Sequence, residues 1–75
     1  MRIREVICEI KEGKEIDWSK DFIKEAIFDS FEIMLLVEQF EQKFECNIKG
    51  TEIIPSNFSS LEAMESMIIR NGGKI

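Results

Sequence analysis

Residues 28–44 read FDSFEIMLLVEQFEQKF, and this stretch predicts the central helix of the protein. It contains no Gly or Pro and ends in a run of good helix formers. At about 100° per residue, five apolar side chains share one narrow stripe that we expect to face a core: Ile33, Leu36, Val37, Phe40 and Phe44. Asp29 and Ser30 directly precede this apolar run, where the N-cap of a helix is expected.

A second face of the same helix is predicted to be a docking surface. Six side chains lie off the core stripe, three apolar and then three acidic: Phe31, Met34, Leu35, Glu38, Glu41 and Glu45. We call these six residues the docking face. Its apolar members follow Ser30 directly, and its acidic members continue from Met34 down the helix at helical spacing. An apolar patch that runs into a row of carboxylates is typical of a surface that binds a basic partner.

The composition indicates one small, acidic globular domain. The 75 residues are 44% hydrophobic and 33% charged, which argues against disorder. Fifteen acidic and ten basic residues give a net charge of −5, which argues against nucleic acid as a partner. Residues 29–45 hold five acidic side chains and one basic side chain, so the central helix carries most of the negative field.

The sequence lacks several features that catalysis, metal binding and secretion require. There is no His, which removes the usual general base and the commonest transition-metal ligand, so we expect no enzyme activity and no metal site. Cys8 and Cys46 are too few for a disulfide framework and are expected to be reduced thiols. The N-terminal segment is charged throughout, and no apolar run approaches membrane-spanning length. We therefore expect a cytoplasmic protein that does not insert into membranes.

The remaining segments predict two further helices and a short helical turn, so the expected fold class is all-α. In one domain of residues 1–75, the expected elements are a helix at about 2–12, a loop at 13–29, the central helix at about 30–45, a turn at 51–54 and a helix at about 60–71. A loop this long is usually functional or packed by its own side chains. We interpret Trp18, within it, as a structural plug and not as a ligand-stacking residue.

Local signals predict where these elements begin and end. Gly13 is expected to end the first helix in the left-handed C′ position. Thr51 is expected to cap the short turn. Ser59 is the predicted N-cap of the last helix, with Glu62 as its partner in a capping box. The sequence Asn-Gly-Gly at 71–73 predicts the end of that helix.

The tetrapeptide DSFE at 29–32 resembles the signature of the acyl carrier and peptidyl carrier proteins, the phosphopantetheine-binding carrier domains. The family signature is Asp-Ser-Leu followed by an acidic residue, and this chain has Phe in place of Leu. The pattern that follows is also similar, with an acidic helix end, a turn near Pro55 and a last helix opened by Ser. Residues 25–44 are particularly similar to stand-alone carriers of the type that includes D-alanyl carrier proteins.

The chain departs from the family pattern at a few positions. Ala26 stands where a Gly is frequent before the signature. Three residues occupy helix positions where many fatty-acid carriers are acidic: Leu35, Gln42 and Lys43.

The resemblance implies a small four-helix bundle of acyl-carrier type, with three main helices plus one short helical turn and a long loop between the first two helices. It implies that Ser30 carries a covalent 4′-phosphopantetheine arm whose thiol holds an acyl or aminoacyl group as a thioester. Asp29 would contact the transferase or its metal. Phe31, Met34 and Leu35 would be apolar docking contacts, and the acidic members of the docking face electrostatic ones.

The resemblance also implies partners. These are a phosphopantetheinyl transferase, an acyl- or aminoacyl-activating ligase, and a downstream acyltransferase or synthase with a basic docking surface, in lipid or secondary-metabolite biosynthesis. The chain is expected to be a monomer that forms transient complexes. Aromatic side chains that crowd a small core favour a short or polar cargo: Trp18, Phe40, Phe44 and Phe58.

The alternative is an unmodified helical protein-interaction module. Its patch of Phe31, Met34 and Leu35 would bind one fixed partner, and Ser30 would be only a helix cap. In that case Ser30→Ala would lower stability by about 1 kcal/mol and leave function intact.

Overall fold

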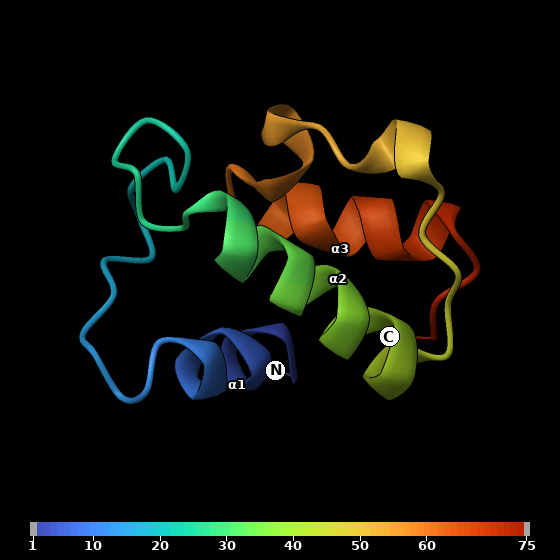
Figure 1. Cartoon of the computed structure of the whole chain (residues 1–75), viewed down its shortest axis with the longest axis horizontal. Helices are drawn as coiled ribbons and strands as arrows, with labels where there is room; N and C mark the ends of the chain where they lie inside the picture. Colours follow the sequence, from blue (N-terminus) through green and yellow to red (C-terminus); the bar gives the residue numbers. More distant parts are fainter. Residues whose placement is uncertain (1, 75) are drawn as a thin grey trace.

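Three α-helices and two 3-10 helices make up the computed structural model, which describes residues 2–74 (Figure 1). In chain order they are α1 (Arg2–Ile10), α2 (Ser30–Phe44), η1 (Gly50–Glu52), η2 (Pro55–Phe58) and α3 (Leu61–Arg70). No strand occurs among these described residues. The predicted all-α fold with a long connection between its first two helices is confirmed. The single short turn expected at 51–54 is instead two separate 3-10 helices.

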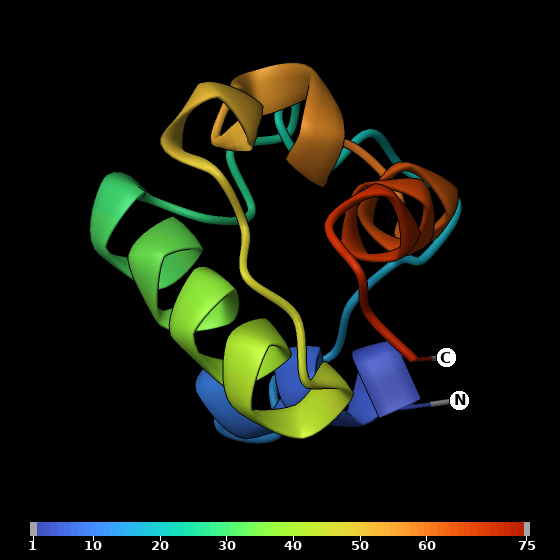
Figure 2. The same cartoon turned by 90° about the vertical axis from the view of Figure 1, so that its right-hand side faces the viewer.

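The helices and 3-10 segments surround one hydrophobic core (Figure 2). Helix α1 packs against α2 and α3, and η2 packs against α3. Four members of the predicted stripe of α2 are buried, whereas Ile33 is only half-buried because it borders a cavity. The other buried residues are Ile3, Val6, Ile7, Phe22, Phe28, Ile48, Phe58, Met64, Met67 and Ile68. Each such side chain stabilises the fold by about 1.5–3 kcal/mol.

Helix α1 ends at Ile10, two residues earlier than predicted. The N–H of Gly13 donates to the carbonyl of Cys8 at 3.2 Å, and the N–H of Glu12 donates to the carbonyl of Glu9 at 3.3 Å. This is the hydrogen-bond pattern of a Schellman motif, in which Glu12 is the C′ residue and Gly13 follows it. Both have positive φ, 54° at Glu12 and 79° at Gly13, so the predicted glycine stop is displaced by one residue.

The predicted N-cap of α3 was wrong by one residue. Ser60 is the N-cap, and its hydroxyl accepts the N–H of Ala63 at 3.0 Å. Ser59 cannot serve because its φ of −76° and ψ of −21° place it in the right-handed helical region as the C-cap of η2. An N-cap residue needs an extended backbone, which Ser60 has. Glu62 is therefore the second residue of the helix and takes no part in a capping box.

The predicted end of α3 is confirmed, whereas the predicted cap of the short turn is wrong. Gly72 has φ +89° and the N–H of Gly73 donates to the carbonyl of Ile68 at 2.8 Å, so the predicted Asn-Gly-Gly stop is confirmed. Thr51 does not cap η1, because this helix already begins at Gly50 and its N-cap, Lys49, makes no side-chain cap. Pro55 opens η2, where its fixed φ and missing N–H fit a first helical position.

The loop between α1 and α2 is packed by its own side chains. Residues 21–26 form one helical turn, in which the Asp21 carboxylate accepts the N–H groups of Ile23 and Lys24 at 2.9 and 3.0 Å. Phe22 is fully buried, and the rings of Trp18 and Phe28 meet it edge-on, with centroids 6.2 and 5.7 Å away. Trp18 thus packs against the core, in agreement with its interpretation as a structural plug.

Candidate functional site

Asp29 and Ser30 stand at the start of α2, and Asp29 is the residue that caps it. The Asp29 carboxylate accepts the N–H of Glu32 at 2.8 Å, and the Glu32 carboxylate accepts the N–H of Asp29 at 3.1 Å. These two bonds form a capping box with Asp29 as N-cap. Ser30 is the first helical residue, so the hypothesis that it caps the helix was wrong. Ser30 is exposed to solvent.

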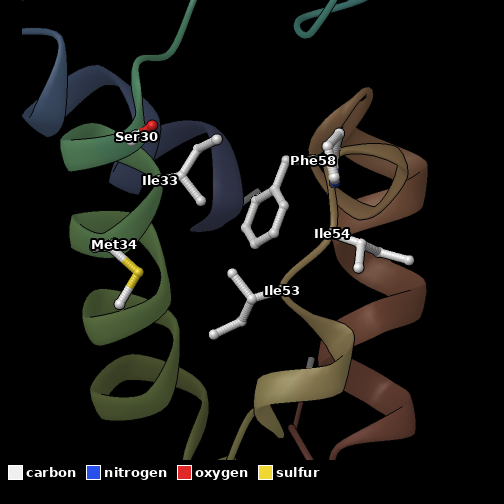
Figure 3. Close-up of a pocket in the computed structure, with 7 residues that line it drawn as sticks. Ser30, Ile33, Met34, Ile53, Ile54 and Phe58 are labelled. Atoms are coloured by element: carbon white, nitrogen blue, oxygen red, sulfur yellow. The ribbon is translucent and has the colours of Figure 1, made fainter.

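Ser30 lies at the rim of an apolar cavity (Figure 3). The cavity has a volume of about 250 Å³ and separates α2 from the segment that includes η1 and η2. Its other lining residues are Ile33, Met34, Ile53, Ile54, Pro55 and Phe58. Side chains of Ile33, Ile53 and Phe58 point into the gap between the two walls (Figure 3). The serine hydroxyl is therefore next to a hydrophobic recess.

The far wall of this cavity is held to α3 by polar contacts. Arg70 Nε lies 2.9 Å from the Glu52 carboxylate, and Arg70 Nη2 donates to the Asn57 side chain at 3.2 Å. Asn57 in turn donates to the carbonyl of Glu52 at 2.6 Å. Sequence reasoning missed this wall. The available signal was the adjacent apolar pair Ile53-Ile54 inside an otherwise polar connector, directly before Pro55.

The docking face is only partly exposed to solvent. Phe31 and Met34 are 71% and 54% exposed, which is unusual for such large apolar side chains, whereas Leu35 is half-buried. Glu38 and Glu45 are exposed. Glu41 is half-buried, and its carboxylate accepts the N–H of Ile48 at 3.0 Å, so it also ties the connector after α2 to the helix.

Cys46 and Cys8 differ in their surroundings. Cys8 is exposed, whereas Cys46 is half-buried and its thiol donates to the carbonyl of Phe40 at 3.4 Å. Burial, and then the neighbouring Glu41 carboxylate, raise the pKa of the Cys46 thiol. No group of three or more His, Cys, Asp or Glu side chains that could hold a metal ion occurs within residues 2–74.

The comparison with known families identifies the class of protein. The family model for the phosphopantetheine attachment site matches residues 2–68. The chain therefore belongs to the family of phosphopantetheine-binding carrier proteins, which bear a covalently attached 4′-phosphopantetheine and act as carriers, not as enzymes. These carriers interact in general with phosphopantetheinyl transferases and with synthases.

Neither the curated proteins nor the solved structures contain a match to the chain. None of the helices in the described part of the chain has the length and apolar character needed to cross a membrane.

Proposed function

We propose that Ser30 is the attachment site of 4′-phosphopantetheine and that the arm holds an acyl or aminoacyl group as a thioester for partner enzymes. One observation carries this assignment: within a matched carrier family, an exposed serine follows the capping aspartate and opens a helix beside an apolar recess. The arm supplies the thiol on which the cargo is carried. The chain itself supplies the serine, its orientation and the surface that partners contact.

The surroundings of Ser30 suit a phosphodiester. The first turn of an α-helix presents N–H groups and the positive end of the helix dipole, and both stabilise an anion. In the transfer, Ser30 Oγ would form a bond to the β-phosphorus of coenzyme A, and the bond to the adenosine-bearing phosphate would break. The leaving group is adenosine 3′,5′-bisphosphate, and the serine proton passes to a base of the transferase. No base within this chain is required.

Asp29 is proposed to contact the transferase or its magnesium ion. Its side chain is exposed, and one carboxylate oxygen, Oδ1, accepts the capping hydrogen bond. Among the described residues no partner is recorded for Oδ2. A carboxylate oxygen at this position is a suitable ligand for magnesium.

The docking face is proposed to receive the transferase, an acyl- or aminoacyl-activating ligase, and a downstream acyltransferase or synthase with a basic surface. Phe31 and Met34 offer exposed apolar contacts immediately beside Ser30. Glu38 and Glu45 offer exposed charges that speed the encounter with a basic partner and make it dependent on salt. Glu41 is proposed to contribute less, because its carboxylate is engaged with Ile48.

The cavity beside Ser30 supports a short cargo. Its volume of about 250 Å³ lies below the roughly 300–1,000 Å³ typical of ligand pockets. Apart from Ser30 its lining is apolar, so the charged amino group of an aminoacyl cargo would find no partner inside. We propose that a short acyl chain can enter and that an aminoacyl group stays outside. An acylated structure with eight or more carbons inside the bundle would contradict this.

We further propose that the chain is a monomer in the cytoplasm and serves lipid or secondary-metabolite biosynthesis. Its two free cysteines support a reducing compartment.

Intact-protein mass spectrometry tests the attachment. The protein is incubated with coenzyme A, magnesium and a broad-specificity phosphopantetheinyl transferase, beside a Ser30→Ala control. We expect the parent to gain one phosphopantetheine, located on Ser30 by peptide mapping, and the control to gain nothing. A folded parent that gains nothing with two different transferases would instead favour an unmodified interaction module that uses the patch of Phe31, Met34 and Leu35.

A further inference from the structure

Lys11 joins three parts of the chain through its ammonium group. It follows directly after α1, and its Nζ donates to the backbone carbonyl of Ile27 at 2.6 Å. The same Nζ lies 3.1 and 2.9 Å from the two carboxylate oxygens of Glu32. Both side chains are largely withdrawn from solvent, with exposed fractions of 15% for Lys11 and 21% for Glu32. Solvent screening of this pair is therefore weaker than for a surface ion pair.

Both acceptors of Lys11 belong to the machinery that presents Ser30. Ile27 is two residues before Asp29, at the point where the loop enters α2. Glu32 is the residue that closes the capping box on Asp29. The ammonium also lies 5.7 Å from the centroid of the Phe28 ring, and Phe28, which comes between these two acceptors in the sequence, is buried in the core. One cation thus holds the loop end and the first turn of α2 in a fixed relation.

The backbone conformation of Ala26, one residue before Ile27, is unfavourable for a residue with a side chain. Ala26 has a φ of +51°, which costs a residue with a side chain more than it costs glycine. The turn at 21–26 that leads into α2 is therefore strained at its last residue. A strained turn next to Ser30 requires contacts with the rest of the fold to hold it in place. The hydrogen bond from Lys11 to the carbonyl of Ile27 is one such contact.

We propose that Lys11 is a positioning residue for phosphopantetheine attachment. Its ammonium keeps Ile27 and Glu32 in place, so that Asp29 and Ser30 meet the transferase in one orientation. It also offsets the negative charge of Glu32, a residue two positions from Ser30, and so reduces the repulsion that this carboxylate would exert on an incoming phosphate. The inference rests on the proposed attachment at Ser30 and adds Lys11, outside the DSFE signature, to the residues that control it.

Transferase kinetics on folded protein test this role. The variants are Lys11→Met, which keeps the apolar stem, Lys11→Arg, which keeps the charge and donors, and the matched control Lys14→Met. Lys14 is exposed, and its one recorded hydrogen bond, within the described residues, is made by its backbone. We expect Lys11→Met to lower kcat by about tenfold with KM within about twofold of the parent, because misplaced reacting groups slow the chemical step. Lys11→Arg should restore most of kcat, and Lys14→Met should match the parent.

The outcomes separate this inference from the proposed function. If the parent is not modified, attachment at Ser30 fails. If the parent is modified and Lys11→Met has the same kcat, or a raised KM alone, the positioning role of Lys11 is overturned. A purely structural role would lower the unfolding midpoint of Lys11→Met without changing kcat of the folded protein. Should Lys11→Met not fold by circular dichroism, Glu32→Gln replaces it, because Gln still caps but loses the charge pair. A lowered kcat in Glu32→Gln supports the proposal, and an unchanged kcat overturns it.

Discussion

Asp29 and Glu32 cap the start of α2 reciprocally, each accepting the backbone N–H of the other. Ser30 lies between them as the first helical residue and contributes no cap. In the sequence, either Asp29 or Ser30 could cap the helix. The structure assigns the cap to Asp29 and leaves Ser30 without a capping role. Asp29 stabilises the helix, and Ser30 is left exposed, as its proposed role as the attachment site requires.

Stability measurements on these two residues should differ. We expect Asp29→Ala to lower the free energy of unfolding by about 1 kcal/mol, because it removes an N-cap. Ser30→Ala should change it by less than about 0.5 kcal/mol, because the hydroxyl makes no cap. Urea denaturation followed by circular dichroism measures both. Equal losses in the two variants would mean that Ser30 shares the cap.

Asp29→Asn separates the capping role of Asp29 from its proposed contact with the transferase or magnesium. Asn caps helices about as well as Asp, so the free energy of unfolding should stay within about 0.5 kcal/mol of the parent. If the carboxylate is needed for the transfer, phosphopantetheinylation should slow by about tenfold at subsaturating magnesium. A variant with unchanged transfer rate would restrict Asp29 to a structural role.

Ala26→Gly should stabilise the protein. Ala26 has a φ of +51°, which glycine adopts without steric cost, while the greater freedom of glycine in the unfolded chain offsets part of the gain. We expect the free energy of unfolding to rise by about 0.5–1 kcal/mol. Ala63→Gly is the control: inside α3, with an ordinary helical backbone, it should lower stability by about 0.5–1 kcal/mol. If both variants are destabilised, Ala26 is not strained.

Phe31→Ala should weaken partner binding without affecting the fold. The side chain is 71% exposed, so stability should stay within about 0.5 kcal/mol of the parent. As an apolar anchor beside Ser30, its loss should raise the KM of the transferase by about tenfold. Ile69→Ala is the matched control, because Ile69 is also a large exposed side chain, 55% exposed, but lies on α3. An equal effect of the two variants would show that the docking face is not used.

The two cysteines should react at different rates. Only the thiolate is nucleophilic, so the raised pKa of Cys46 lowers its reactive fraction at any pH below that pKa, and burial restricts access further. Iodoacetamide at pH 8 should alkylate the exposed Cys8 of the folded protein severalfold faster than it alkylates Cys46. Peptide mass spectrometry measures both rates, and in urea they should converge. Faster modification of Cys46 in the folded protein would contradict the hydrogen bond to Phe40.

Much of the fold follows from local sequence. The apolar period of residues 33–44 set the buried face of α2, and Asn-Gly-Gly at 71–73 set the end of α3. Local sequence does not fix where a helix starts when two adjacent candidate caps carry nearly the same local signal. Ser60, and not Ser59, is the N-cap of α3, because Ser59 ends η2 with a backbone in the right-handed helical region. Asp29 replaced Ser30 because Glu32 then stands at the third helical position, where it completes the box.

The sequence alone determined the helical fold, the DSFE signature and the resemblance to phosphopantetheine carriers, because these depend on residue type and short-range spacing. Only the tertiary structure decided what surrounds Ser30. Two features of this site join residues about 20 or more positions apart in the sequence. One is the contact of Lys11 with Glu32, and the other is the cavity wall opposite α2, formed by Ile53, Ile54, Pro55 and Phe58. Helical periodicity relates residues three or four positions apart, so such contacts depend on how α1, α2 and the connector pack around the core.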